Sequence, residues 1–276
     1  LYRQLAARNR DAYLPDLAMA VNNYANHLAQ AGRHADALTA AKEAVTLRRE
    51  LAALDRDAYL PDLAMAIDNY AVYLAETGQH DQALTAAKEA VTLRRELAAL
   101  NRDAYLPDLA GSLNNYANHL AQAGRRDQAL TVAEEALNLY RQLAARNRDA
   151  YLPDLAGSLS NYASRLAETG QRDQALTVAE EALNLYRQLA ARNRDAYLPD
   201  LAMAVNNYAI RLAETGQHDQ ALTAAEEAVT LRRELAALNR DAHLPDLAGS
   251  LNNYAVYLAR ARSEEHTSEL QSLRHL

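Results

Sequence analysis

Histidines and paired glutamates are the residues of this sequence whose types are typical of catalytic or metal sites. The histidines recur at fixed positions of a repeat, His27 and His119 at one, and His34, His80 and His218 at another. Glutamate pairs recur in the same way at Glu134/Glu135, Glu180/Glu181 and Glu226/Glu227. Copies of a helix that pack side by side lie about 8–10 Å apart between axes, which is poor geometry for a shared metal. We interpret both sets as solvated helix surface.

The sequence lacks the residues and motifs of other common catalytic sites. The chain has no Cys, which removes thiol nucleophiles, disulfides and Cys-type zinc sites. It contains no Gly-rich phosphate loop and no His-Glu-x-x-His helix. We therefore expect no enzyme activity, no cofactor, no metal and no small-molecule substrate.

The net charge and the hydropathy of the sequence argue against nucleic-acid and membrane partners. The net charge of −7 gives no support for a nucleic-acid partner, which favours a basic patch. No apolar run approaches the length of a membrane span, so we expect no membrane partner. The absence of Cys suits a reducing compartment, and we expect a cytoplasmic location.

The chain is one repeat, copied. Its six prolines recur in steps of 46 residues, at Pro15, Pro61, Pro107, Pro153, Pro199 and Pro245. Five of its eight glycines recur in the same steps, at Gly32, Gly78, Gly124, Gly170 and Gly216. Each repeat therefore carries one Pro and one Gly as its turn signals.

Each repeat predicts two helices. The first is expected to open at the proline, which is favoured at a helix start, and the following Asp suits the positive helix end. In the second repeat this helix runs from Pro61 to about Thr77 and stops at Gly78. The second helix runs from near Asp81 to about Leu100. No stretch alternates with period two, so no strand is expected.

Helix pairs of this kind bury their apolar faces only by stacking, which predicts an all-α solenoid of antiparallel pairs. The order Ile67, Tyr70-Ala71, Leu74, Gly78, Ala83 and Ala90 resembles the tetratricopeptide repeat (TPR). The extended second helix and the run from Leu113 to Ala117 are similar to the long, kinesin-light-chain-like TPR type found in bacterial signalling proteins. The resemblance implies a right-handed superhelix. Ala87 departs from the family pattern, where a bulky aromatic is usual, and Arg95 stands near the usual terminal Pro.

The pattern defines a solenoid over residues 1–261 and a tail over residues 262–276. The solenoid comprises a half repeat, five full repeats and one leading helix. The tail segment from Arg262 to Ser272 resembles an in-frame translation of a sequencing-library adapter. We therefore expect the chain to be a fragment with a non-native tail that makes few buried contacts.

The first helix of each repeat carries the candidate binding face, which in a TPR stack lines the concave groove. One position on this face is always asparagine, and we call it the asparagine column: Asn23, Asn69, Asn115, Asn161, Asn207 and Asn253. A side-chain amide both donates and accepts, so the column can hold a peptide backbone without selecting its side chains. The alternative is recent duplication, which makes most positions invariant.

Two positions vary between otherwise matching repeats and predict specificity. The first variable column is Asn26, Val72, Asn118, Ser164, Ile210 and Val256. The second variable column, on the groove flank, is His27, Tyr73, His119, Arg165, Arg211 and Tyr257. A third position alternates between Met and Gly, as at Met65 and Gly111. Shuffling of blocks of sequence, which we call cassettes and which carry either Met-Ala or Gly-Ser here, explains this alternation better than ligand contact.

Two functions remain open from the sequence. One is a protein-interaction scaffold that binds an extended peptide or partner domain in the groove. The other is a sensor or oligomerisation module of a larger bacterial signalling NTPase. A phosphate-binding Gly-Lys-Ser/Thr loop upstream in the intact gene would favour the second.

Overall fold

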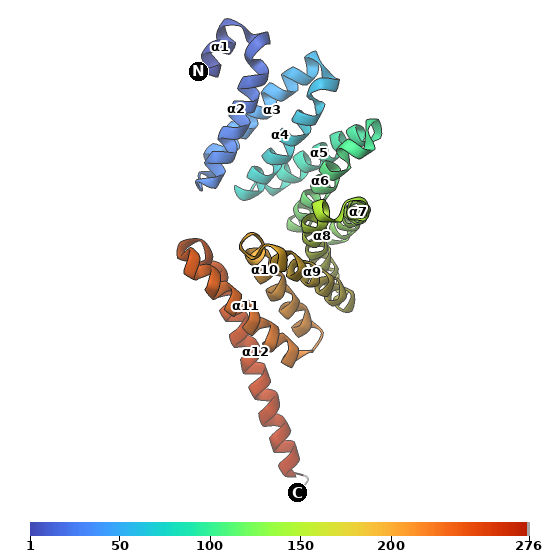
Figure 1. Cartoon of the computed structure of the whole chain (residues 1–276), viewed down its shortest axis with the longest axis vertical. Helices are drawn as coiled ribbons and strands as arrows, with labels where there is room; N and C mark the ends of the chain where they lie inside the picture. The colour runs from blue at the N-terminus through green and yellow to red at the C-terminus, as the bar shows by residue number, and fades with distance from the viewer. Residues whose placement is uncertain (275–276) are drawn as a thin grey trace. The chain divides into compact units, whose positions relative to one another are not determined.

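The computed structural model describes the backbone of residues 1–274 and the side chains of residues 1–263. Within that range the chain is helical, with no strand (Figure 1). The helices are α1 (Tyr2–Arg8), α2 (Arg10–Gln30), α3 (His34–Leu54), α4 (Arg56–Glu76), α5 (His80–Leu100), α6 (Arg102–Gln122), α7 (Arg126–Arg146), α8 (Arg148–Glu168), α9 (Arg172–Arg192), α10 (Arg194–Glu214), α11 (His218–Leu238) and α12 (Arg240–Arg274). The all-α architecture and the two helices per repeat are confirmed. The even-numbered helices are the first helices of their repeats, and α3, α5, α7, α9 and α11 are the second helices.

A single residue joins each second helix to the next first helix. Between α5 and α6 this joint is Asn101, with φ −144° and ψ 92°. Its backbone N–H donates to the carbonyl of Leu97 and so closes α5. Its side-chain oxygen accepts the N–H of Ala104 at 3.2 Å and so caps α6. The same residue therefore ends one helix and begins the next.

The prediction that first helices begin at the proline is wrong. Helix α4 begins at Arg56, and Pro61 lies inside it. The cause is the cap, because Asp55 accepts the N–H of Ala58 at 3.0 Å and starts the helix one and a half turns earlier. Proline lacks the N–H that would reach the carbonyl of Asp57, so α4 loses one backbone hydrogen bond there.

The turn within each repeat depends on glycine, as predicted. Gly78 follows α4 with φ +78°, in the left-handed region that glycine adopts without steric cost. The N–H of Gln79 donates to the carbonyl of Leu74 at 2.8 Å, and that of Gly78 donates to Ala75 at 2.9 Å. These two bonds form a Schellman motif, which reverses the chain so that α5 returns antiparallel to α4.

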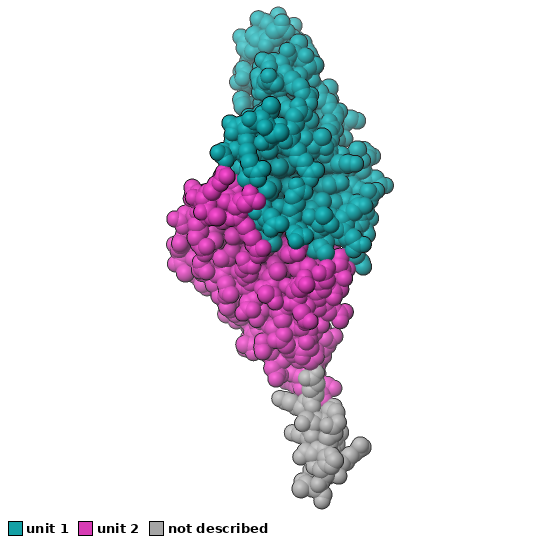
Figure 2. All heavy atoms as spheres, turned by 90° about the vertical axis from the view of Figure 1, so that its right-hand side faces the viewer, with its two compact units in different colours: residues 1–139 teal, residues 140–276 magenta. Residues whose placement is uncertain are grey.

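Residues 1–139 and residues 140–276 form two compact units (Figure 2). Each unit has its own buried core. In the first unit the fully buried side chains include Leu60, Ile67 and Leu113. In the second they include Leu152 and Leu159. Alanine fills the remaining inner positions of the helices, which lets neighbouring helices approach closely.

The inner face of α5 is apolar except at one residue. Ala83, Val91 and Leu97 are buried. Arg94 lies on the same face, and its side chain is only 7% exposed. Its guanidinium donates to Asp108 of α6 at 2.7 Å. The aspartate after the proline therefore pairs with a buried arginine, whereas a helix-start role had been expected.

The two ends of the array are less buried than its middle. Leu5 and Leu258 are half-buried, while their internal copies Leu97 and Leu120 are buried. Helix α12 continues without a break into the tail, as far as Arg274. The expectation of few buried contacts in the tail concerns side chains, such as those of Leu270 and Leu273, that lie outside the described residues. Among the described helices, none is long and apolar enough to cross a membrane.

Candidate functional site

The asparagine column lies on partly accessible surface of the first helices. Asn23 is exposed, and its five copies are half-buried. Two of these amides already make hydrogen bonds within the protein. The Nδ2 of Asn69 donates to Oδ1 of Asn22 at 3.4 Å, and Nδ2 of Asn253 donates to Asn206 at 3.2 Å. The column therefore links neighbouring first helices in these two places.

The two variable columns face each other across neighbouring first helices. The hydroxyl of Tyr73 on α4 donates to Oδ1 of Asn26 on α2 at 2.7 Å. Tyr73, His119 and Tyr257 of the second variable column are buried, with 6–7% exposure. Of the other members, His27 is exposed, while Arg165 and Arg211 are half-buried. Three of the six predicted specificity residues in this column are thus inserted between helices.

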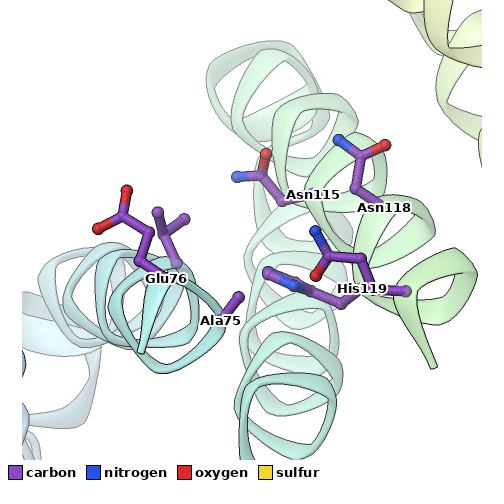
Figure 3. A pocket seen from close by; sticks show the side chains of 7 residues that line it. Ala75, Glu76, Asn115, Asn118 and His119 are labelled. Carbon is purple, nitrogen blue, oxygen red and sulfur yellow. The ribbon is translucent and has the colours of Figure 1, made fainter. Parts of the chain in front are cut away.

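A pocket of about 310 Å³ lies between α4 and α6 in the first unit (Figure 3). Val72, Ala75 and Glu76 line it from α4. Asn115, Asn118 and His119 line it from α6, together with Gln122. It therefore brings together one member of the asparagine column, Asn115, and three members of the variable columns.

His119 is the unusual member of this pocket. Its side chain extends from α6 toward α4 in Figure 3, and its residue is 6% exposed. Neither ring nitrogen lies in standard hydrogen-bond geometry with a described residue, although an interaction with the side chain of Gln122 raises the pKa of the ring. Burial is the larger effect, and together with nearby His80 it lowers the pKa of His119. The ring is therefore neutral at pH 7, with one nitrogen able to accept.

The corresponding residues of α8 and α10 carry arginine. Arg211 takes the place of His119, and its guanidinium pairs with Glu214 on the same helix at 2.6 Å. Arg165 pairs with Glu168 at 3.1 Å in the same way. Both arginine side chains are largely buried, at 13–14% exposure. In these helices the nearby glutamate is therefore neutralised by an arginine of its own helix.

A buried polar cluster lies beside the asparagine column and was missed from the sequence. Asp68 on α4 has a side-chain exposure of 14%, and the hydroxyl of Ser112 donates to it at 2.5 Å. The guanidinium of Arg94 lies 3.8 Å away. Burial raises the pKa of Asp68 to about 6. The available signal was that Asp68 alone is acidic at a position held elsewhere by Asn or Ser, as at Asn22 and Asn206.

The Met/Gly position has a packing explanation. A Cβ added to Gly157 on α8 would lie 3.5 Å from the hydroxyl oxygen of Tyr186 on α9. In the sequence, each complete repeat with Gly here carries Tyr on its second helix, and each with Met carries Arg. Gly on the first helix therefore occurs together with Tyr on the second helix, and Met together with Arg. This joint variation agrees with shuffling of whole cassettes.

The paired glutamates form ion pairs on the outer face. Glu135 accepts from Arg95 at 2.7 Å, Glu181 from Arg141 at 3.0 Å and Glu227 from Arg187 at 2.9 Å. Each pair joins consecutive second helices, and all its members are well exposed. In the part of the chain with described side chains, no cluster of three or more His, Asp or Glu is arranged to hold a metal ion.

Models of the tetratricopeptide repeat match five segments, which together cover more than half of the chain. One model matches residues 63–98 and 155–193, and a second matches residues 18–43, 110–135 and 202–227. The chain belongs to the tetratricopeptide repeat family. Each matched segment spans parts of both helices of one repeat, so the TPR assignment agrees with the helix pairs described above.

Solved structures share the TPR fold at low sequence identity. A putative kinesin light chain with nearly identical TPR-like repeats, from Podosopora anserina, is 17% identical, with a TM-score of 0.61 over 80% of this chain and 96% of that one. BtubC (BKLC) from P. vanneervenii is 22% identical, with a TM-score of 0.57 over 84% and 91%. A Rap protein, solved in complex with competence and sporulation factor, is 15% identical, with a TM-score of 0.59 over 92% and 66%. No curated protein sequence matches the chain.

Proposed function

We propose that this TPR array is a protein-interaction scaffold whose first helices hold an extended peptide or a partner domain. The observation that carries the proposal is the surface of α6, where Asn115 and Asn118 line a pocket between neighbouring first helices. Amides at such a place pair with either the N–H or the carbonyl of a bound backbone. The Rap protein of the same fold was solved with competence and sporulation factor, which supports a binding role for arrays of this kind.

The proposal is tested by selecting peptides from a random displayed library against the full chain. The selected peptides are then synthesised, and their Kd is measured for the double variant Asn115→Ala/Asn161→Ala. Each lost hydrogen bond contributes about 0.5–1.5 kcal/mol, so binding should weaken by about 5- to 100-fold. The matched control is Asn138→Ala/Asn184→Ala, which changes two exposed asparagines of the second helices.

Two outcomes contradict the proposal. One is a library that yields no peptide with saturable binding. The other is a groove double variant that binds its peptide unchanged but melts at a lower temperature than the control. In that case the asparagine column stabilises the stack of helices, as the bonds of Asn69 and Asn253 already do.

A further inference from the structure

The pocket between α4 and α6 results from a mismatch between the two variable columns. Between α2 and α4 the corresponding pair is Asn26 and Tyr73, and a hydrogen bond joins them. Between α4 and α6 the pair is Val72 and His119, and valine offers no acceptor. The ring of His119 is also shorter than a tyrosine side chain. The space is therefore left open, and neither ring nitrogen makes a hydrogen bond of standard geometry to a described residue, the side chain of Gln122 being its one polar interaction of the hydrogen-bond type.

A buried polar group without a partner is costly, so this histidine indicates a ligand. Leaving a buried donor or acceptor unpaired forfeits its hydration without any compensation. A ligand that donates to the neutral ring of His119 would restore the lost bond. The neighbouring amides of Asn115, Asn118 and Gln122 supply further oxygens that accept hydrogen bonds.

The charge of the pocket identifies the type of ligand. Glu76 is the acidic residue of the pocket lining, and its side chain is 38% exposed. Its described partner is Nδ1 of His34 at 2.8 Å, an exposed imidazole that is charged only when protonated. By contrast, Glu168 and Glu214 are each paired with a permanently charged arginine. Glu76 is thus available to a cation that the other two carboxylates would bind less well.

We propose that this pocket binds one basic side chain, lysine or arginine, of a peptide held on the first helices. The cationic group lies beside Glu76, and the oxygens of Asn115 and Asn118 and the unprotonated nitrogen of His119 accept its N–H groups. Val72 and Ala75 contact its aliphatic stem, as apolar surface commonly does for such side chains. The inference rests on the proposed peptide scaffold and names the side chain that this part of it recognises.

The volume agrees with one side chain. A pocket of about 310 Å³ is at the lower limit of small-molecule sites, which span about 300–1,000 Å³. The low pKa of His119 matters here, because a protonated ring would repel the incoming cation. An acidic side chain would meet the carboxylate of Glu76 without any lining cation to offset it.

The probe is the blocked peptide acetyl-Ala-Ala-Lys-Ala-Ala-amide, titrated into the ¹⁵N-labelled full chain. Two further peptides replace its lysine with norleucine or with glutamate. We expect saturable shifts of α4 and α6 amides with the lysine peptide, and at least about tenfold weaker binding of the norleucine peptide. Equal binding of these two, or tighter binding of the glutamate peptide, overturns the inference. This comparison needs no variant of the protein.

Variants copied from other repeats of the chain complete the test. Glu76→Gln matches Gln122, and we expect at least fivefold weaker lysine-peptide binding. His119→Tyr matches Tyr73 and fills the pocket, so the titration should be lost. The control Glu214→Gln removes a carboxylate already paired with Arg211 and should leave the Kd within twofold. Unchanged binding by both pocket variants overturns the inference.

Failure of this inference is distinct from failure of the scaffold. Library peptides that depend on Asn115 and Asn161 but ignore Glu76 and His119 support the scaffold and refute the basic-side-chain pocket. A lysine peptide that binds at His119, in a chain for which the library yields no binder, supports the pocket and refutes the scaffold.

Discussion

Helices α4/α6 and α8/α10 show how one side chain changes the surface of a constant frame. Both pairs consist of neighbouring first helices with the same cap, proline and glycine positions. His119 leaves a pocket beside Glu76, whereas Arg211 binds the glutamate of its own helix. The comparison teaches that the residue at the second variable column decides whether this surface is open or closed by an ion pair, while the caps and turns of the helices stay the same.

The largest expected effect tests whether equivalent core residues of the two regions contribute equally to stability. Leu113 and Leu159 occupy the same repeat position and are fully buried. We expect Leu113→Ala and Leu159→Ala each to cost about 2–5 kcal/mol of local stability, because each leaves a cavity. Hydrogen exchange of α6 and α8, respectively, measures the loss. A difference of more than about 2 kcal/mol between the two variants would show that the frame is not constant.

The next effect concerns the cassette pairing of Gly157 and Tyr186. A Cβ at Gly157 would make an ordinary van der Waals contact of 3.5 Å with the hydroxyl oxygen of Tyr186, so a methyl group fits without displacing it. Gly157→Ala should therefore stabilise α8 by up to about 1 kcal/mol through helix propensity. Gly157→Met should destabilise it by about 1–3 kcal/mol through overpacking.

A variant that exchanges the whole cassette provides the control for the opposite effects of Ala and Met at residue 157. The triple variant Gly157→Met/Ser158→Ala/Tyr186→Arg copies the residues of the Met-type repeats. Its urea unfolding should return close to that of the parent chain. If Gly157→Met alone were tolerated, or if the triple variant gave no recovery, the pairing would not explain the alternation.

A third effect is pH-dependent and arises from Asp68 in the first unit. The folded-state pKa of Asp68 is about 6, above the ordinary value of an unfolded aspartate, because the carboxyl is buried. The folded state therefore binds more protons between about pH 4 and pH 6, and Asp68 makes stability fall as pH rises through this window. His119, whose pKa is lowered, acts in the opposite direction.

The Asp68 contribution is isolated by subtraction. Asp68→Asn copies Asn206 of the other unit and removes the titrating group. Relative to this variant, the parent chain should lose about 1–2 kcal/mol between pH 4.5 and pH 7. Parallel stability curves for the two proteins across this range would exclude a raised pKa at Asp68.

The smallest effect tests the joints, which should be equivalent in both units. Asn101 and Asn147 cap α6 and α8 through their Oδ1 atoms, at 3.2 and 3.3 Å. Either asparagine replaced by alanine should cost about 1 kcal/mol, and replacement by aspartate, as at Asp55, should cost little. Thermal unfolding measures both. An alanine variant as stable as the aspartate variant would mean that the cap contributes nothing.

The fold was predictable because its signals repeat. Glycine with positive φ and the spacing of leucine and alanine fixed the turns and inner faces correctly. The helix start was predicted wrongly, because proline was given more weight than the capping residue six positions earlier. The end of α5 near Leu100 was predicted, but the role of the next residue, Asn101, as the cap of α6 was not.

The candidate site was predictable only in part. Helical spacing placed the asparagine and variable columns on the first helices, but it treated the two variable columns as independent. They meet at an offset of 47 residues, as Tyr73 and Asn26 show, one more than the repeat length. That offset arises from how neighbouring helices pack, so burial of His119 could not be deduced from a single helix.

The one-residue joint also determines where such a gene can be cut and rejoined. A recombination crossover at a joint such as Asn147 transfers a first helix together with its second helix, and so keeps Gly157 with Tyr186. A crossover in the turn at Gly170 separates the two and unites Met with Tyr, or Gly with Arg. The unit exchanged by recombination is therefore the helix pair that begins at the joint asparagine. Because the joint is a single residue, exchange at this point preserves the 46-residue length of each repeat.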